Sequence, residues 1–179
     1  MTGSGGGPEK TGSVLIVDDD EGARSSLGLI FKKKGHKVET AGTGQEAVDK
    51  AKARFFNVAL LDIRLPDIEG VDVLASLKTM HPDMAVIMVT GYASMETAVR
   101  ALNAGASAYV VKPLDMDHVV ATVEDALLRQ WLVLENRRLY EEAQRELAER
   151  RKVEEALRTS EERYRFLYEE SPAIALIVG

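Results

Sequence analysis

The fold class follows from one stretch of the sequence, Val58-Ala59-Leu60-Leu61-Asp62-Ile63-Arg64-Leu65-Pro66. Four apolar residues lead directly into the carboxylate of Asp62, and Leu65-Pro66 ends the segment. A short apolar run bounded by chain breakers is typical of a strand buried on both faces of a parallel sheet. Asp62 would then lie at the carboxyl edge of that sheet, where open α/β folds bind ligands. An acid at this place either caps the next helix or takes part in chemistry, and the stretch alone leaves both open.

Four further segments have the character of strands, and helical patterns separate all five. These strands are predicted at residues 14–17, 37–41, 84–89 and 108–111. Apolar residues recur at helical spacing between them, so each connection is long enough for a crossover helix. The sequence therefore predicts an α/β protein with a doubly wound five-stranded parallel sheet and a long C-terminal helical extension.

Composition excludes several classes of function. The chain has 179 residues, of which 45% are hydrophobic, enough for one packed domain with an appended segment. A net charge of −6 argues against nonspecific nucleic-acid binding and gives no basic face for a membrane. Without cysteine, disulfides, thiolate catalysis and cysteine-ligated metals are excluded. No apolar run approaches the roughly 18 residues of a membrane span and no signal peptide is recognisable, so we expect a cytoplasmic protein.

The chain after Leu114 contains no Gly or Pro until Pro172, and Asp115 is the expected N-cap of one long helix. Two seven-residue series run along it, Leu132, Leu139, Glu146, Val153, Ser160 and Leu167, and Asn136, Ala143, Arg150, Leu157 and Tyr164. Seven of these eleven residues are apolar. A helix of this length needs a partner. We therefore predict a coiled-coil signalling helix over residues 131–170 and a homodimer through residues 115–170, with a single solvated helix as the alternative.

The two ends of the chain differ in character from the rest. Residues 1–12 are Gly-rich with little to bury, and we predict a disordered leader. Residues 174–178 are apolar and have no strand after them to pair with, so residues 171–179 are predicted to begin a truncated further domain. The α/β domain itself is assigned to residues 13–130.

The predicted strand ends bring polar side chains to one edge of the sheet. Asp18 and Asp19 follow the first strand, Thr90 the fourth and Lys112 the fifth. If Asp18, Asp19 and Asp62 share one crevice, their three carboxylates need compensating positive charge, which Lys112 and a divalent cation would supply. Oxygen ligands without sulfur favour Mg²⁺, with Mn²⁺ as a substitute. This set suits phosphoryl transfer, in which Asp62 attacks phosphorus while Lys112 and Thr90 bind the transferred group.

Each of these residues also has a purely structural interpretation. Asp19 or Asp20 can cap the helix that follows, and for Asp20 we expect this role. Thr90 can be a turn or cap residue, Lys112 a solvated surface lysine, and Tyr109 a core residue. Their joint occurrence at the ends of four strands favours the site over these separate interpretations.

Taken together, the motifs resemble the receiver domain of two-component response regulators. The matching segments are Val-Leu-Ile-Val-Asp18-Asp19-Asp20, Leu-Leu-Asp62-Ile-Arg-Leu-Pro66-Asp-Ile-Glu-Gly70, Met-Val-Thr90-Gly-Tyr-Ala and Gly105-Ala-Ser-Ala-Tyr109-Val-Val-Lys112-Pro113. The resemblance covers residues 13–130 and implies a flavodoxin-like receiver fold. It implies that Asp62 accepts a phosphoryl group from a sensor histidine kinase. Such a domain catalyses only its own phosphorylation and dephosphorylation, so no enzyme activity on other substrates is expected.

The same resemblance implies roles for individual residues. Mg²⁺ would be bound by Asp19, Asp62 and the backbone carbonyl of Arg64, with Asp18 acting largely through water. Thr90 and Tyr109 correspond to a switch pair that moves inward on phosphorylation. The peptide bond between Lys112 and Pro113 would be cis.

The last residues resemble the entry of a PAS sensor domain, in the segment Ser160-Glu-Glu-Arg-Tyr-Arg-Phe-Leu-Tyr-Glu-Glu-Ser-Pro172-Ala-Ile-Ala-Leu-Ile-Val. This implies a downstream PAS or output domain to which a dimeric helix transmits the receiver's conformational change. Two other function classes stay open. One is a constitutive coiled-coil dimerisation scaffold. The other is an aspartate-nucleophile phosphatase, which usually has a second acid two residues after the nucleophile, where this chain has Arg64.

Overall fold

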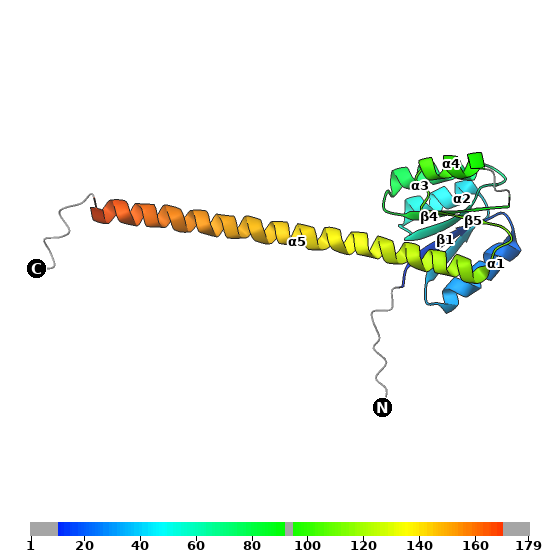
Figure 1. Ribbon diagram of the computed structural model, residues 1–179, viewed down its shortest axis with the longest axis horizontal. Helices are drawn as coiled ribbons and strands as arrows, with labels where there is room; N and C mark the ends of the chain where they lie inside the picture. The colour runs from blue at the N-terminus through cyan, green and yellow to red at the C-terminus, as the bar shows by residue number, and fades with distance from the viewer. Residues whose placement is uncertain (1–10, 92–94, 170–179) are drawn as a thin grey trace, which may run out of the picture. The chain divides into compact units, whose positions relative to one another are not determined.

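A computed structural model describes residues 11–91 and 95–169 of the protein. The strands are β1 Ser13–Val17, β2 Lys37–Ala41, β3 Val58–Asp62, β4 Ala85–Thr90 and β5 Ala108–Val111. The helices are α1 Glu21–Lys33, α2 Gly44–Ala53, α3 Gly70–Met80, α4 Met95–Asn103 and α5 Met116–Glu169. Strand and helix alternate along the chain as predicted (Figure 1).

All five strands are parallel and lie in the order β2-β1-β3-β4-β5. The chain moves outward from β1 to β2, then returns to the other side of β1 and adds β3, β4 and β5. This reversal of direction makes the sheet doubly wound and places a topological switch point between β1 and β3. The predicted fold class is therefore confirmed.

Successive residues of the central strands face opposite sides of the sheet, and each side has its own core. Leu15 of β1 and Leu61 of β3 pack among residues from α2, α3 and α4. Ile16 of β1 and Leu60 of β3 pack on the other side, among residues from α1 and the first part of α5. Figure 1 shows the helices divided in this way between the two faces. All five residues of β3 are buried, as its continuous apolar run predicts.

Acidic side chains start two of the helices. Asp20 accepts hydrogen bonds from the backbone N–H groups of Gly22 and Ala23, and these bonds lower the pKa of its carboxyl group. Asp115 accepts one from the backbone N–H of Asp117 at the start of α5. Both predicted caps are confirmed. A cap that helical spacing suggests at Ser94 falls outside the described residues.

The first part of α5 is anchored to the base of the sheet by a buried amide. The Gln130 side chain is 6% exposed, accepts a hydrogen bond from Asn57 Nδ2 at 2.8 Å, and donates one to the Asp83 carbonyl at 2.6 Å. Asn57 in turn accepts a hydrogen bond from the backbone N–H of Ser13. Buried amides need such partners, and this network links α5 to the start of β1.

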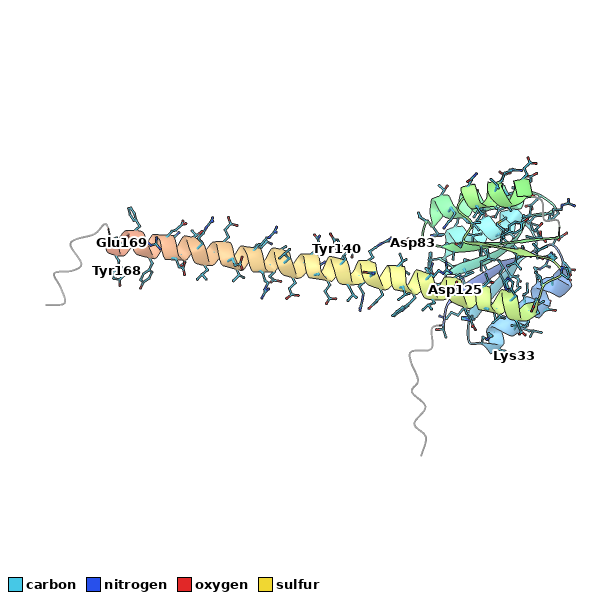
Figure 2. All side chains as sticks on the ribbon, in the orientation of Figure 1. Lys33, Asp83, Asp125, Tyr140, Tyr168 and Glu169 are labelled. Atoms are coloured by element: carbon cyan, nitrogen blue, oxygen red, sulfur yellow. The ribbon has the colours of Figure 1, made fainter. Side chains whose placement is uncertain are left out.

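Beyond Leu132 the chain forms a second compact unit, whose described part is helical through Glu169. Its large apolar side chains are exposed, including Leu139, Val153 and Leu157, each by half or more. Tyr140 and Tyr168, which Figure 2 labels, are exposed to a similar extent. The coiled coil, its solvated alternative and the domain boundaries stay predictions. The PAS-like segment at 171–179 and most of the leader lie outside the described residues. None of the described helices is long and apolar enough to cross a membrane.

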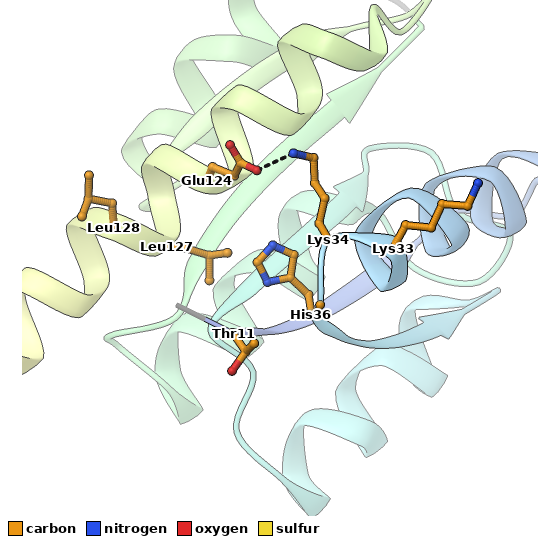
Figure 3. A pocket seen from close by; sticks show the side chains of 8 residues that line it. Thr11, Lys33, Lys34, His36, Glu124, Leu127 and Leu128 are labelled. Carbon is orange, nitrogen blue, oxygen red and sulfur yellow. Dashed lines mark hydrogen bonds and ion pairs between the residues drawn. The ribbon is translucent and has the colours of Figure 1, made fainter. Parts of the chain in front are cut away.

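His36 lies in a pocket between the end of α1 and the first part of α5 (Figure 3). Its Nδ1 accepts a hydrogen bond from the Gly12 backbone N–H at 3.2 Å, so this nitrogen carries no proton. An ion pair of 2.8 Å between Lys34 and Glu124 crosses the same pocket. Burial lowers the pKa of His36, and the charge of Lys34 acts in the same direction, while Glu124 opposes it. His36 therefore has a structural role at this contact between α1 and α5.

Stability should depend on the protonation of His36. Because its folded-state pKa lies below the ordinary value of about 6.5, the unfolded chain binds the proton more readily, and the free energy of unfolding should fall as pH drops through and below that value. His36→Gln should flatten this part of the profile in urea unfolding. His118→Gln, at an exposed position, should keep the wild-type slope. A full wild-type slope in His36→Gln would contradict this role.

Candidate functional site

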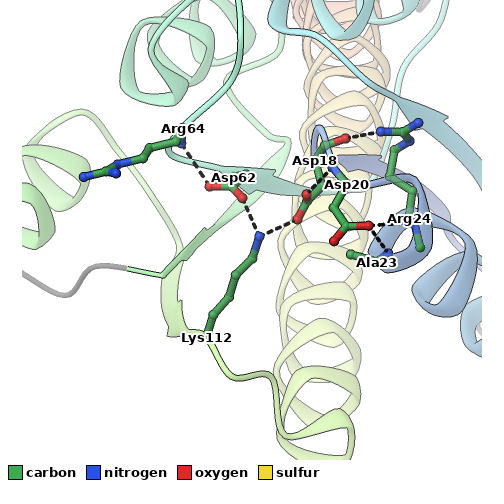
Figure 4. A network of polar contacts seen from close by, with 8 residues as sticks. Asp18, Asp20, Ala23, Arg24, Asp62, Arg64 and Lys112 are labelled. Atoms are coloured by element: carbon green, nitrogen blue, oxygen red, sulfur yellow. Dashed lines mark hydrogen bonds and ion pairs between the residues drawn. The ribbon is translucent and has the colours of Figure 1, made fainter.

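The carboxyl ends of four adjacent strands meet at one edge of the sheet, and each contributes a polar residue. Asp18 directly follows β1, Asp62 ends β3, Thr90 ends β4 and Lys112 directly follows β5. The register pairs Asp62 with Val89, the residue before Thr90. The structure thus brings these residues to the edge that their sequence positions suggested, and Figure 4 shows Asp18, Asp62 and Lys112 there.

Three carboxylates form the acidic part of this site. Asp18, Asp19 and Asp62 each place a carboxylate oxygen within 4.8 Å of those of the other two. Asp18 and Asp62 are buried, at 3% and 6% exposure, whereas Asp19 is exposed. Hard carboxylate oxygens at this separation fit a divalent cation such as Mg²⁺, which prefers oxygen ligands and keeps several waters. The exposed side of the cluster, at Asp19, leaves room for those waters.

Lys112 compensates part of this negative charge. Its Nζ lies 2.5 Å from Asp62 Oδ2 and 2.8 Å from Asp18 Oδ2. Burial lowers the pKa of the Lys112 ammonium, but its hydrogen bonds to both carboxylates outweigh this, and the net shift is upward. Three carboxylates and one ammonium leave a formal charge of −2 when all four groups are ionised. Lys112 is thus not a solvated surface lysine, and the bond to Pro113 is cis as expected.

Both carboxylate oxygens of Asp62 are held in place. Oδ2 accepts the bond from Lys112, and Oδ1 accepts one from the backbone N–H of Arg64 at 2.9 Å. The backbone N–H of Ile63 also donates to the Val89 carbonyl at 3.0 Å, which fixes the chain directly after Asp62. The carboxylate is thereby oriented before any ligand binds. The Arg64 carbonyl as a metal ligand stays a prediction.

Asp67, in the loop between β3 and α3, and Gly70, the first residue of α3, have roles that the sequence did not reveal. A Cβ added to Gly70 would lie 2.2 Å from the Asp62 carbonyl oxygen and 2.8 Å from Ile63 Cα, so only glycine fits here. Asp67 accepts hydrogen bonds of 2.8 Å from the backbone N–H groups of Gly44 and Gln45. The bonds from Gln45 and Gly44 lower the pKa of the Asp67 carboxyl group. Both residues belong to the motif that follows Asp62, but the motif does not show which backbone groups they approach.

Thr90 and Tyr109, the predicted switch pair, lie on the adjacent strands β4 and β5. Thr90 is 3% exposed, and its carbonyl accepts a hydrogen bond from the Lys112 backbone N–H at 2.6 Å. The Tyr109 ring packs against the core on the α2–α4 side of the sheet. Its hydroxyl is buried and has no hydrogen-bond partner among the described residues. The ring is thus part of the core, as one interpretation held, and its switch role stays a prediction.

Comparison with known proteins agrees with this geometry. The family model of the response regulator receiver domain matches residues 14–124. Among curated proteins, the chain is 37% identical over 114 residues to the transcriptional regulatory protein ZraR of Escherichia coli strain K12, covering 64% of this chain and 26% of that protein. It is 40% identical over 112 residues to the regulatory protein LuxO of Vibrio vulnificus, covering 63% and 25%. The chain therefore spans about a quarter of the length of these relatives.

Two solved receiver domains have a similar fold. A CheY-like receiver domain protein from Methanospirillum hungatei matches with a TM-score of 0.66 and 42% identity, over 67% of this chain and 96% of that one. The beryllofluoride-activated NtrC4 receiver domain dimer matches with a TM-score of 0.63 and 38% identity, over 66% and 98%.

Replacing Gly70 should disturb the backbone on which Asp62 depends. In Gly70→Ala, the new methyl group must displace the Asp62 carbonyl, and overpacking of this kind costs about 1–3 kcal/mol in urea unfolding. Gly91→Ala is the matched control, because an added Cβ at Gly91 meets no described atom within 4 Å. Equal losses in the two variants would show that the close approach at Gly70 has no special cost.

Proposed function

The chain belongs to the response regulator receiver domain family, and we propose that Asp62 accepts a phosphoryl group from a sensor histidine kinase in a Mg²⁺-dependent reaction. One observation carries this proposal. The Asp62 carboxylate is buried, is held by the Arg64 N–H and the Lys112 ammonium, and lies within 4.8 Å of two further carboxylates. A nucleophile oriented in this way beside a site for a hard cation is what phosphoryl transfer requires.

In the proposed reaction, an Asp62 oxygen forms a bond to phosphorus while the bond from phosphorus to the donor's imidazole nitrogen breaks. Lys112 is already 2.5 Å from Asp62 Oδ2 and can contact a phosphoryl oxygen as the acyl phosphate forms. Asp18, Asp19 and Asp62, with the Arg64 carbonyl, would hold Mg²⁺, which neutralises phosphoryl oxygens when bound. Thr90, at the end of the neighbouring strand, would donate a hydrogen bond from its hydroxyl to the transferred phosphoryl group.

We propose no catalysis beyond the domain's own phosphorylation and dephosphorylation. A phosphatase that uses an aspartate nucleophile would need a second acid to activate water. Two residues after Asp62 the chain has Arg64, whose side chain is exposed and positively charged. The arrangement therefore supports a phosphoacceptor better than a phosphatase with turnover.

The proposed signal leaves through Thr90 and Tyr109. An acyl phosphate on Asp62 adds acceptor oxygens beside the end of β4, to which a Thr90 hydroxyl can turn. The Tyr109 hydroxyl has no hydrogen-bond partner among the described residues, and an outward rotamer of the ring would let this hydroxyl bond to water. Phosphorylation would then shift the population between two conformations of the receiver.

We propose that α5 conveys this shift to a homodimer formed through residues 115–170 and to a downstream PAS or output domain. The support is the continuity of α5 from its anchored part to Glu169, together with the exposed apolar residues along the two seven-residue series. In a coiled coil, partner helices bury such residues against each other. The alternative is a constitutive scaffold, in which dimerisation does not respond to phosphorylation.

Phosphorylation should require Asp62 itself. Incubation of the full chain with acetyl phosphate and Mg²⁺ should add one phosphoryl group by intact-mass spectrometry, and Asp62→Asn should add none, because the amide is not a nucleophile. Asp20→Asn is the control, since it removes an acid at the same edge while keeping a good helix cap. Equal labelling of Asp62→Asn would refute the assignment.

Dimerisation should respond to the activated state and depend on the two seven-residue series. Light scattering with beryllofluoride and Mg²⁺ should show a mass or affinity change relative to the untreated chain. Leu157→Lys, within the series, should weaken the dimer, whereas Ala148→Lys, outside both series on the same helix, should not. A dimer whose mass and affinity do not change with beryllofluoride would favour the constitutive scaffold. A monomer under all conditions would exclude both the responsive dimer and the scaffold.

A further inference from the structure

One cationic side chain beside the acidic cluster has no part in the proposed phosphoryl chemistry. Arg24 lies in the first turns of α1, and its Nη1 donates a hydrogen bond of 2.5 Å to the backbone carbonyl of Asp18 (Figure 4). The side chain is half-buried. A Cβ added to Gly42 would lie 3.3 Å from the same nitrogen, so the guanidinium rests against the backbone at the start of the β2–α2 loop.

Side-chain interactions also hold the β2–α2 loop in place. Glu46 accepts a hydrogen bond from the Gly42 N–H at 2.8 Å and pairs with Lys50 at 2.8 Å. Lys50 also donates to the Thr40 carbonyl. The bonds from Lys50 and Gly42 lower the pKa of Glu46, and the Arg24 charge adds to this. Arg24 thus packs against a loop that these interactions hold in place, while it donates a hydrogen bond to the Asp18 carbonyl.

The bond from Arg24 completes the hydrogen bonding of Asp18. The Asp18 N–H donates to the Ala41 carbonyl at 3.2 Å, Oδ1 accepts from the Asp20 N–H at 2.9 Å, and Oδ2 accepts from Lys112 at 2.8 Å. Only the carbonyl is left for Arg24. Because a peptide unit is planar, the orientation of this carbonyl also fixes the N–H and Cα of the next residue, Asp19.

We propose that Arg24 is a positioning residue for the divalent-cation site. By holding the peptide unit between Asp18 and Asp19, it directs both carboxylates toward Asp62. This inference rests on the proposed function, because it assumes that the three carboxylates bind Mg²⁺. Residues that orient metal ligands without touching the metal commonly change affinity by 10- to 100-fold when they are replaced.

Charge and position make opposite predictions for Arg24, which allows a sharp test. A positive charge near a cation site repels the cation, so Arg24→Ala would bind Mg²⁺ more tightly if charge were the only effect. If Arg24 positions the carboxylates, the same variant binds more weakly. Arg24→Lys keeps the charge but loses the planar fork that reaches the carbonyl and Gly42 together, so it too should bind more weakly.

The experiment is a calorimetric Mg²⁺ titration of the full wild-type chain, Arg24→Ala, Arg24→Lys and the control Arg129→Ala, with thermal unfolding of each sample. Arg129 is exposed and pairs with Asp125, one turn earlier on α5. We expect about 10- to 100-fold weaker binding in both Arg24 variants and wild-type affinity in the control. If Arg24→Ala is not folded, Arg24→Lys carries the comparison.

The outcomes separate this inference from the function on which it rests. Arg24 variants that are folded and bind Mg²⁺ as tightly as the wild type, or more tightly, would overturn the positioning role while leaving the phosphoacceptor proposal intact. A wild-type chain that does not bind Mg²⁺ would overturn the proposed function itself.

Discussion

The Lys112 ammonium lies between two buried carboxylates, 2.5 Å from Asp62 Oδ2 and 2.8 Å from Asp18 Oδ2. Two buried carboxylates that share one ammonium lie close together and repel each other unless cations compensate their charge. The strand order provides for this, because β1 and β3 are neighbours and β5 lies two strands beyond β3 on the same edge. Lys112 compensates part of the charge, and what is left is suited to a divalent cation. The sheet therefore presents the Asp62 carboxylate in a fixed orientation, held by the Arg64 N–H and the Lys112 ammonium.

Much of this arrangement was predictable because it depends on local pattern. β3 ends at Asp62 as predicted, because a continuous apolar run marks a buried strand and Leu65-Pro66 marks the end of the segment. β4 begins and ends one residue later than predicted, at Ala85 and Thr90, within the usual uncertainty of strand ends. Asp20 and Asp115 begin their helices as expected, because capping needs only a short polar side chain next to a helical pattern.

The parts that were not predictable depend on contacts between segments distant in sequence. Gly70 is required because its Cα approaches the Asp62 carbonyl, and nothing in the surrounding residues signals that approach. Gln130 looks like one more polar residue on a long helix, yet it is buried against Asn57 and Asp83. Arg24 likewise has no motif, and its bond to Asp18 depends on how α1 packs beside the β2–α2 loop. Charge and periodicity identify the reacting residues better than the residues that hold them.

The central claim is that Asp62 carries the phosphoryl group as an acyl phosphate, and borohydride trapping tests it most directly. Sodium borohydride reduces an aspartyl phosphate to homoserine, with loss of the phosphate, and leaves ordinary carboxylates and phosphate esters unchanged. After treatment with acetyl phosphate and Mg²⁺, peptide mass spectrometry should find homoserine at residue 62 alone. Homoserine at Asp18, Asp19 or Asp20 instead, or a phosphate that survives reduction on a hydroxyl side chain, would contradict the account.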